Sequence, residues 1–165
     1  QGIEVSKGDI RKNKDLANKK YQVLLCQRVL INLLNKNDQR KALDNLISLV
    51  KTGGLLIFIE CFNDSMNNLN ILREGFSLEP IEPSHHNLYL PNDIFNNKRM
   101  AIFDDTQENF LSTHYFISRV LHPLYLNYNN LSFERNSDFV NNLTKSLPEN
   151  VGTYSPLKFL SFIKY

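Results

Sequence analysis

Residues 21–60 read YQVLLCQRVLINLLNKNDQRKALDNLISLVKTGGLLIFIE, and this stretch decides the fold. The run Val23–Cys26 is continuously apolar, which is typical of a parallel strand covered on both faces. From Asp38, a candidate N-cap, apolar residues recur every three or four positions as far as the Lys51–Gly54 joint, which predicts an amphipathic helix. The apolar run Leu55–Ile59 predicts a second strand. Strand, helix and strand with short joints predict a right-handed, parallel βαβ unit.

Outside this unit the sequence predicts a single α/β domain with shorter elements. Its 165 residues, 42% of them hydrophobic, suffice for one core and not for two ordinary domains. We expect, in chain order, a short β-favouring piece at Ile3–Val5, a helix over Ser65–Glu74 ended by Gly75, a less regular region over Phe76–Asp105 with a short strand at His86–Leu90, helical structure over Phe110–Leu126 and a closing strand at Leu157–Tyr165.

Composition excludes several classes of function. The formal net charge is +2, from 19 basic and 17 acidic residues without a long single-sign block, so we expect no nucleic-acid partner and no membrane partner. Cys26 and Cys61 lack the further Cys or His spacing of a metal site or a disulfide framework, which favours free thiols and no metal. No apolar stretch has the length of a membrane span, and no signal peptide begins the sequence. We therefore expect a soluble, cytoplasmic protein.

Candidate site residues follow the predicted strands, because ligands of open α/β sheets bind beyond the carboxyl ends of the strands. Asp9 follows Gly8 and precedes Ile10. Its carboxylate is suited to accept a hydrogen bond from an adenine amino group while the Ile10 N–H meets a ring nitrogen. The alternative is an ordinary Gly-Asp turn.

Two further strand ends carry polar residues. Gln27 and Arg28 follow Cys26, and they either point into a binding crevice or form polar loop tips. Glu60 follows five apolar residues, so its carboxylate lies at the rim of the sheet or is paired. It is a candidate general base, and its alternative role is to cap the next helix.

Taken together, these segments resemble a known enzyme family. Residues 21–33, then Gln39 with Ala42-Leu43, then residues 49–60 are similar in order and spacing to the fourth strand, the following helix and the fifth strand of class I S-adenosylmethionine-dependent methyltransferases. The Lys51–Gly54 joint looks like that family's Lys-Pro-Gly-Gly turn, and Gly8-Asp9-Ile10 stands where its adenine-contacting motif would lie. The resemblance covers residues 3–62 well and the remainder more loosely. Gln22 departs from the aspartate that the family often has before the fourth strand.

The resemblance implies an α/β fold: a partial Rossmann-like methyltransferase sheet from its third strand onward, mostly parallel with an antiparallel closing strand, and with helices on both faces. It implies one incomplete methyltransferase domain over residues 1–165, with a cofactor-side β/α core at 1–62 and acceptor-side helices and the closing strand at 63–165. No Gly-x-Gly loop follows any strand, so the family's first strand, glycine loop and ribose-binding acidic residue would lie upstream, over roughly 60 residues.

The implied cofactor is S-adenosyl-L-methionine, and the implied reaction is methyl transfer to a small-molecule or sugar-type acceptor. Asp9 and Ile10 would hold adenine, and Cys26, Gln27 and Arg28 would line the amino-acid end of the cofactor. The acceptor would sit over Glu60 and over the loop and helix residues His86, Asn87, Tyr115 and Arg119.

For each acceptor-side residue an alternative stays open. Among these residues His86 is the best proton acceptor by its intrinsic pKa. The alternative is that His86, which lies in a Pro-flanked loop beside His85, is a plain surface residue. Tyr115 and Arg119 form an acceptor lid or belong to a helix that buries aromatic residues.

Two other hypotheses compete with catalysis by this chain. One is a non-catalytic truncated methyltransferase, or a half-domain that completes itself by pairing with another chain; exposed sheet edges would favour a homo-oligomer. The other is a nucleotide-binding α/β protein of a different kind, which would need a phosphate-binding glycine loop.

Overall fold

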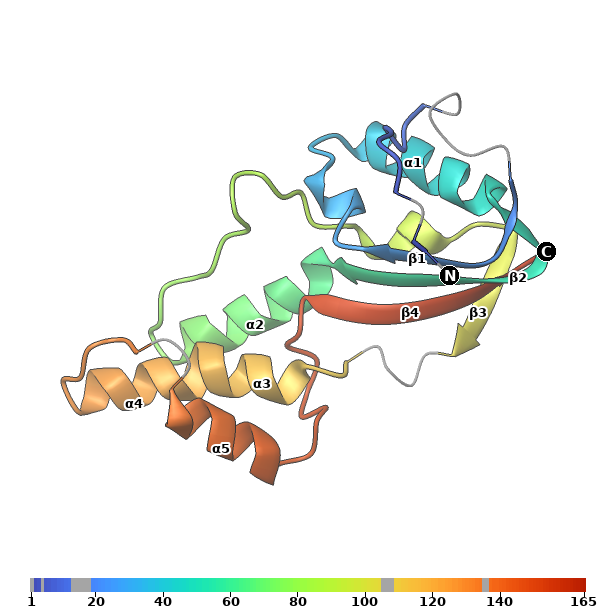
Figure 1. Cartoon of the computed structure of the whole chain (residues 1–165). Coiled ribbons are helices and arrows are strands. Elements are labelled where there is room, and N and C mark those ends of the chain that lie inside the picture. Colours follow the sequence, from blue (N-terminus) through green and yellow to red (C-terminus); the bar gives the residue numbers. More distant parts are fainter. Residues whose placement is uncertain (1, 4, 13–18, 105–108, 135–136) are drawn as a thin grey trace.

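The computed structural model describes residues 2–3, 5–12, 19–104, 109–134 and 137–165 (Figure 1). Its strands are β1 (Tyr21–Gln27), β2 (Val50–Cys61), β3 (Met100–Asp104) and β4 (Leu157–Lys164). Its α-helices are α1 (Lys36–Ser48), α2 (Asn63–Gly75), α3 (Ser112–Phe116), α4 (His122–Tyr128) and α5 (Asp138–Ser146). Shorter turns are the 3-10 helices η2 (Leu30–Asn32) and η3 (Asn92–Phe95), and the π-helix η4 (Ile117–Leu121) joins α3 to α4.

The strands form one mixed sheet in the order β1-β2-β4-β3. β1 and β2 are parallel, as the βαβ pattern predicts, with Leu25 beside Ile57. β4 is antiparallel to both of its neighbours, β2 and β3. The expectation of a mostly parallel, partial Rossmann-like sheet is therefore wrong, because two of the three pairings are antiparallel.

The expectation that the sheet begins with the family's third strand, at Ile3–Val5, is also wrong. Ile3 and Val5 lie outside any strand and are almost fully exposed, and residue 4 between them lies outside the described residues. A three-residue β-favouring piece offers little apolar surface to bury, so the pattern alone did not fix a strand there. The parallel part of the sheet begins at β1.

One face of the sheet carries the main core. Residues of α1, η2 and η3 pack on it around the fully buried Phe58, whose ring lies 4.6 Å from that of Phe95 and 6.0 Å from that of Phe162 between centroids. The opposite face is open at β1, where Val23 is 55% exposed and Leu25 is 59% exposed, and it is partly covered at β4, where Phe110 packs against Phe159. Helices on both faces were expected, whereas the helices that contribute to the main core lie on one face.

Helices α2 to α5 extend from the carboxyl end of β2 as a separate group (Figure 1). A second core of Met66, Leu69, Leu78 and Val120 holds α2 against the α3-to-α4 segment. The predicted helix over 65–74 is thus confirmed as α2, and the predicted helical region over 110–126 is confirmed as α3, η4 and α4. No helix among the described residues is long and apolar enough to cross a membrane.

The joint between α1 and β2 differs from the prediction. Asn35, not Asp38, caps α1, since its side chain accepts hydrogen bonds from the N–H groups of Asn37 and Asp38 at 2.8 and 3.4 Å. The Lys51–Gly54 turn lies inside β2, where Gly53 has φ of 75° and the β1 register shifts. Gly54 is buried, and a Cβ there would lie 2.6 Å from a Val50 methyl carbon, so only glycine fits.

Candidate functional site

The carboxyl ends of β1 and β2 lie side by side, because the two strands are parallel. Gln27 ends β1, and Arg28 follows it with φ of 51°, a left-handed conformation that non-glycine residues rarely adopt. The Arg28 N–H donates to the Ile59 carbonyl at 2.9 Å, which continues the ladder past the end of β1. Both side chains are exposed, so this edge presents a guanidinium and an amide to solvent.

Glu60 holds the turn that follows Arg28. Its buried carboxylate accepts the backbone N–H groups of Val29, Leu30 and Ile31 at 2.8, 3.1 and 3.4 Å. The Cys26 thiol donates to the same carboxylate at 3.4 Å. Burial raises the pKa of Glu60, and the three N–H groups act in the opposite direction. With 0% of its surface exposed, this carboxylate anchors η2, an earlier turn of the chain, and it does not cap the next helix, α2, as the alternative interpretation expected.

Cys61, Tyr89 and Tyr115 surround the same edge on its inner side. Burial raises the pKa of Cys61 to about 11, and burial raises the pKa of Tyr89, whose hydroxyl is hydrogen-bonded to the Cys61 sulfur, to about 12. Burial also raises the pKa of Tyr115, and the nearby Cys61 raises it further, while the charges of Arg119 and then Arg28 lower it. Tyr115 therefore lies near Cys61 and Arg28 as well as near Arg119. None of these groups is ionised at neutral pH.

The cysteines should be inert towards thiol reagents in the folded protein. Both are buried free thiols, and burial raises the pKa of Cys26 even further than that of Cys61. With a pKa of about 11, roughly one part in a thousand of Cys61 is thiolate at pH 8, and the thiolate is the nucleophile. We expect Ellman's reagent to react with neither thiol over minutes at pH 8, and with both in concentrated guanidinium chloride. Fast reaction of one thiol in the native protein would contradict this burial.

The loop with His86 and Asn87 lies against the same strand ends. The Leu88 N–H donates to the Ile31 carbonyl at 2.7 Å, and the Leu90 N–H donates to the Cys61 carbonyl at 2.8 Å. The predicted strand over 86–90 is reduced to a single bridge between Phe62 and Leu90. His86 is exposed, with its ring centroid 5.0 Å from that of His85, and Asn87 is half-buried. The structure therefore brings this loop to the edge where Arg28 lies.

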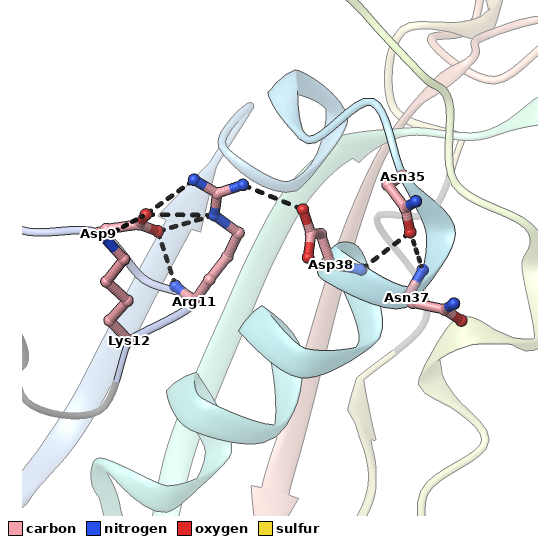
Figure 2. A network of polar contacts seen from close by, with 6 residues as sticks. All are labelled: Asp9, Arg11, Lys12, Asn35, Asn37 and Asp38. Atoms are coloured by element: carbon pink, nitrogen blue, oxygen red, sulfur yellow. Dashed lines mark hydrogen bonds and ion pairs between the residues drawn. The ribbon is translucent and has the colours of Figure 1, made fainter.

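Asp9 and Ile10 have partners of their own, and Figure 2 shows those of Asp9. The Asp9 carboxylate accepts hydrogen bonds from the backbone N–H, Nε and Nη2 of Arg11 at 2.9, 3.0 and 2.8 Å, and the second Arg11 amino group pairs with Asp38 of α1 at 3.0 Å. These bonds hold the pKa of Asp9 well below its usual range. The Ile10 carbonyl accepts from the Asn45 amide at 2.8 Å.

This network ties residues 9–12 to the start of α1 (Figure 2). Among the described residues, no hydrogen bond or ion pair joins Asp9 or Ile10 to residues 26–28. The Gly-Asp turn interpretation therefore accounts for Asp9 in this structure. The Ile10 N–H has no acceptor within the described part of the chain.

Arg119 lies apart from these residues. It belongs to η4, and it lines a cavity formed with residues of α3, α4, α5 and the segment before α5, with no residue of the sheet. Its backbone carbonyl accepts a hydrogen bond from the buried Arg73. Burial raises the pKa of Tyr115 and the charge of Arg119 lowers it, so these two residues of one continuous helical segment stay near each other, although Arg119 lines this cavity and Tyr115 does not.

One feature of the β2 end escaped sequence reasoning. Lys158 of β4 is buried and pairs with Asp64 of α2 at 2.8 Å, with its ammonium 5.1 Å from the centroid of the Phe62 ring. The Lys158–Asp64 pair borders a cavity of about 500 Å³ that lies between η3 and the β3–β4 edge. A lysine near the start of an otherwise mostly apolar strand was the available signal, but its partner is 94 positions away in sequence.

Within the described residues, no three His, Cys, Asp or Glu side chains come together in a way that could hold a metal ion. No protein-family model matches the chain, and no curated protein matches it.

Proposed function

We propose that this chain is the part of an S-adenosylmethionine-dependent methyltransferase that holds the amino-acid end of the cofactor, working in the cytoplasm as part of a longer enzyme. The observation that carries the proposal is Arg28, an exposed arginine in a left-handed conformation directly after a parallel strand. Such conformations are sparsely populated and cluster at functional sites. Here the Glu60 carboxylate holds the turn that imposes it.

The residues at this edge fit one end of the cofactor. A guanidinium pairs with a carboxylate through two parallel hydrogen bonds, so Arg28 suits the carboxylate of the methionine moiety, with Gln27 beside it. At the adenine end, the Ile10 N–H suits a ring nitrogen, whereas Arg11 already engages the carboxylate of Asp9. The glycine loop that the family resemblance requires would come from outside these residues.

The cofactor supplies a sulfonium-bound methyl group, which is a strong methyl donor. The protein residues then have to orient the acceptor and exclude water. Tyr115 and the loop with His86 and Asn87 border the same edge, and they are the groups we assign to a small-molecule or sugar-type acceptor. His86 is the exposed member of this group, and its imidazole ring is the candidate proton acceptor.

The open sheet face favours the second candidate function, a non-catalytic half-domain that associates with another chain or a second copy. β1 is an edge strand without a charged residue, and Val23 and Leu25 are exposed on its uncovered face. Natural edge strands are normally protected by charge, bulges or cover, so an unprotected edge of this kind favours association. The same edge is where further strands of a longer enzyme would add.

Calorimetric titration with S-adenosylmethionine tests the proposal. We expect binding by a version of the protein extended upstream to weaken about tenfold or more in Arg28→Gln, because one charge-assisted bidentate contact is lost. Glutamine at this position keeps the same unfavourable φ, so the backbone strain is matched. Arg40→Gln, on the exposed side of α1, is the control and should leave affinity unchanged.

Light scattering on the same samples separates the two candidate functions. Cofactor binding that depends on Arg28 supports the methyltransferase. The half-domain is supported instead if the 165-residue chain forms a stable dimer and neither this chain nor the extended version binds the cofactor. Cofactor binding that is equal in Arg28→Gln and in the parent would overturn the role assigned to Arg28.

A further inference from the structure

A second cavity lies in the helical part of the chain, away from the sheet. It has a volume of about 390 Å³, within the range of small-molecule sites. Its lining comes from α3, η4, α4, α5 and the segment before α5, and it includes Ser118, Arg119, Phe133, Glu134, Ser137 and Val140.

Two opposite charges line this cavity without neutralising each other. Arg119 and Glu134 both border it, yet within the described part of the chain no ion pair joins them or engages either side chain. Burial, and then the charge of Arg119, lowers the pKa of His114 in the same lining, so this ring carries no charge at pH 7. The cavity thus offers a guanidinium and a carboxylate separated by more than the length of an ion pair.

The backbone around Arg119 is specialised. Residues 117–121 form a π-helix between two α-helices, and π-helical turns are frequent at functional sites. Ile117 and Val120 of this turn are fully buried, and Val120 packs in the second core. In this π-helical turn, Ile117 and Val120 are therefore held in the interior, while Ser118 and Arg119 line the cavity.

The opposite wall has one unpartnered polar group and an apolar surface. Ser137, the N-cap of α5, is 8% exposed, lines the cavity and makes no side-chain capping bond. No hydrogen bond of its hydroxyl to another described residue is present, and the hydroxyl oxygen is not among the fully buried unpartnered atoms, so it is accessible to a ligand in the cavity. Phe133 and Val140 provide apolar surface next to it.

We propose that this cavity binds a small zwitterion of the amino-acid type with an apolar side chain. The carboxylate pairs with Arg119 and accepts from the Ser137 hydroxyl, the ammonium pairs with Glu134, and the side chain packs on Phe133 and Val140. A ligand with one positive and one negative group matches two fixed charges of opposite sign, whereas a simple anion leaves the repulsion of Glu134 uncompensated. The proposal is independent of the methyl-transfer function, because no residue of the strand-end site lines this cavity.

Calorimetry with three probes tests the proposal on the full chain. L-leucine carries both charges, L-leucinamide lacks the carboxylate, and 4-methylpentanoate lacks the ammonium group. We expect leucine to bind at least about tenfold more tightly than either analogue, as each analogue leaves one charge of the cavity unpaired. Arg119→Gln and Glu134→Gln should each weaken leucine binding about tenfold.

Matched controls and a folding check complete the design. Arg40→Gln and Glu82→Gln change the same residue types on exposed positions outside the cavity and should leave leucine affinity unchanged. Far-UV circular dichroism establishes that each variant is folded, and amide shifts in the NMR spectrum should move at Ser137 and Val140. Binding that survives Arg28→Gln and is lost in Arg119→Gln separates this cavity from the strand-end site.

Two results would overturn the proposal. One is the absence of leucine binding at concentrations up to about 10 mM. The other is equal binding of leucine and 4-methylpentanoate, which would make the cavity a simple anion site.

Discussion

Replacing Glu60 by alanine should lower the free energy of unfolding by about 4 kcal/mol. The change leaves three backbone N–H groups, those of Val29, Leu30 and Ile31, without their acceptor. A buried donor that loses its partner costs ~1–3 kcal/mol, and removal of the carboxylate also opens a cavity under η2. Urea denaturation followed by circular dichroism measures the change.

The control is Glu79→Ala, since the Glu79 side chain is exposed and should contribute less than about 0.5 kcal/mol. Glu60→Gln should fall between the two, because an amide oxygen replaces one acceptor while the amide NH₂ opposes an N–H donor. A Glu60→Ala protein as stable as its parent would show that the carboxylate does not hold the turn, and would return Glu60 to the list of candidate bases.

The sequence predicted the elements whose patterns are local. Val23–Cys26 and Leu55–Ile59 are continuous apolar runs, and the helix between them has clear three- and four-residue periodicity, so β1, α1 and β2 lie where they were expected. Pairing direction is different, because apolar runs look alike in parallel and antiparallel strands. Nothing in Leu157–Lys164 indicates that it lies between β2 and β3. β3 is also short and ends in exposed residues, so its sequence does not stand out from the irregular region predicted over Phe76–Asp105.

The same limit applies to the candidate site. The strand-end rule located Arg28 and Glu60 at one edge, because it depends only on where each strand ends. It could not tell whether Glu60 is a general base or an acceptor for backbone N–H groups. The N–H groups that donate to Glu60 belong to a turn thirty positions earlier in the chain. The cavity beside Arg119 could not be predicted from the sequence, because Glu134 and Ser137 lie near η4 only through the packing of α5.

Replacing Phe58 by alanine should lower the free energy of unfolding by ~3–5 kcal/mol, the usual cost of deleting a fully buried phenylalanine ring. The Phe58 ring contacts Phe95 and Phe162 at the centre of the covered face, so its loss leaves a cavity that the rigid strands β2 and β4 cannot close. Guanidinium denaturation of the variant and the parent measures the difference. A loss below about 1 kcal/mol would contradict the central place of this ring.

Phe103→Ala is the matched control from the edge strand β3, because Phe103 is 62% exposed. For the isolated chain we expect a change within about 0.5 kcal/mol. Both variants should be measured at two protein concentrations. Contacts between subunits contribute stability that depends on concentration, whereas contacts within one subunit do not. A Phe103→Ala effect that grows with concentration would mean that a second copy covers this strand. A small loss of stability that is the same at both concentrations would mean that no second copy of this chain covers the exposed side chains of β3.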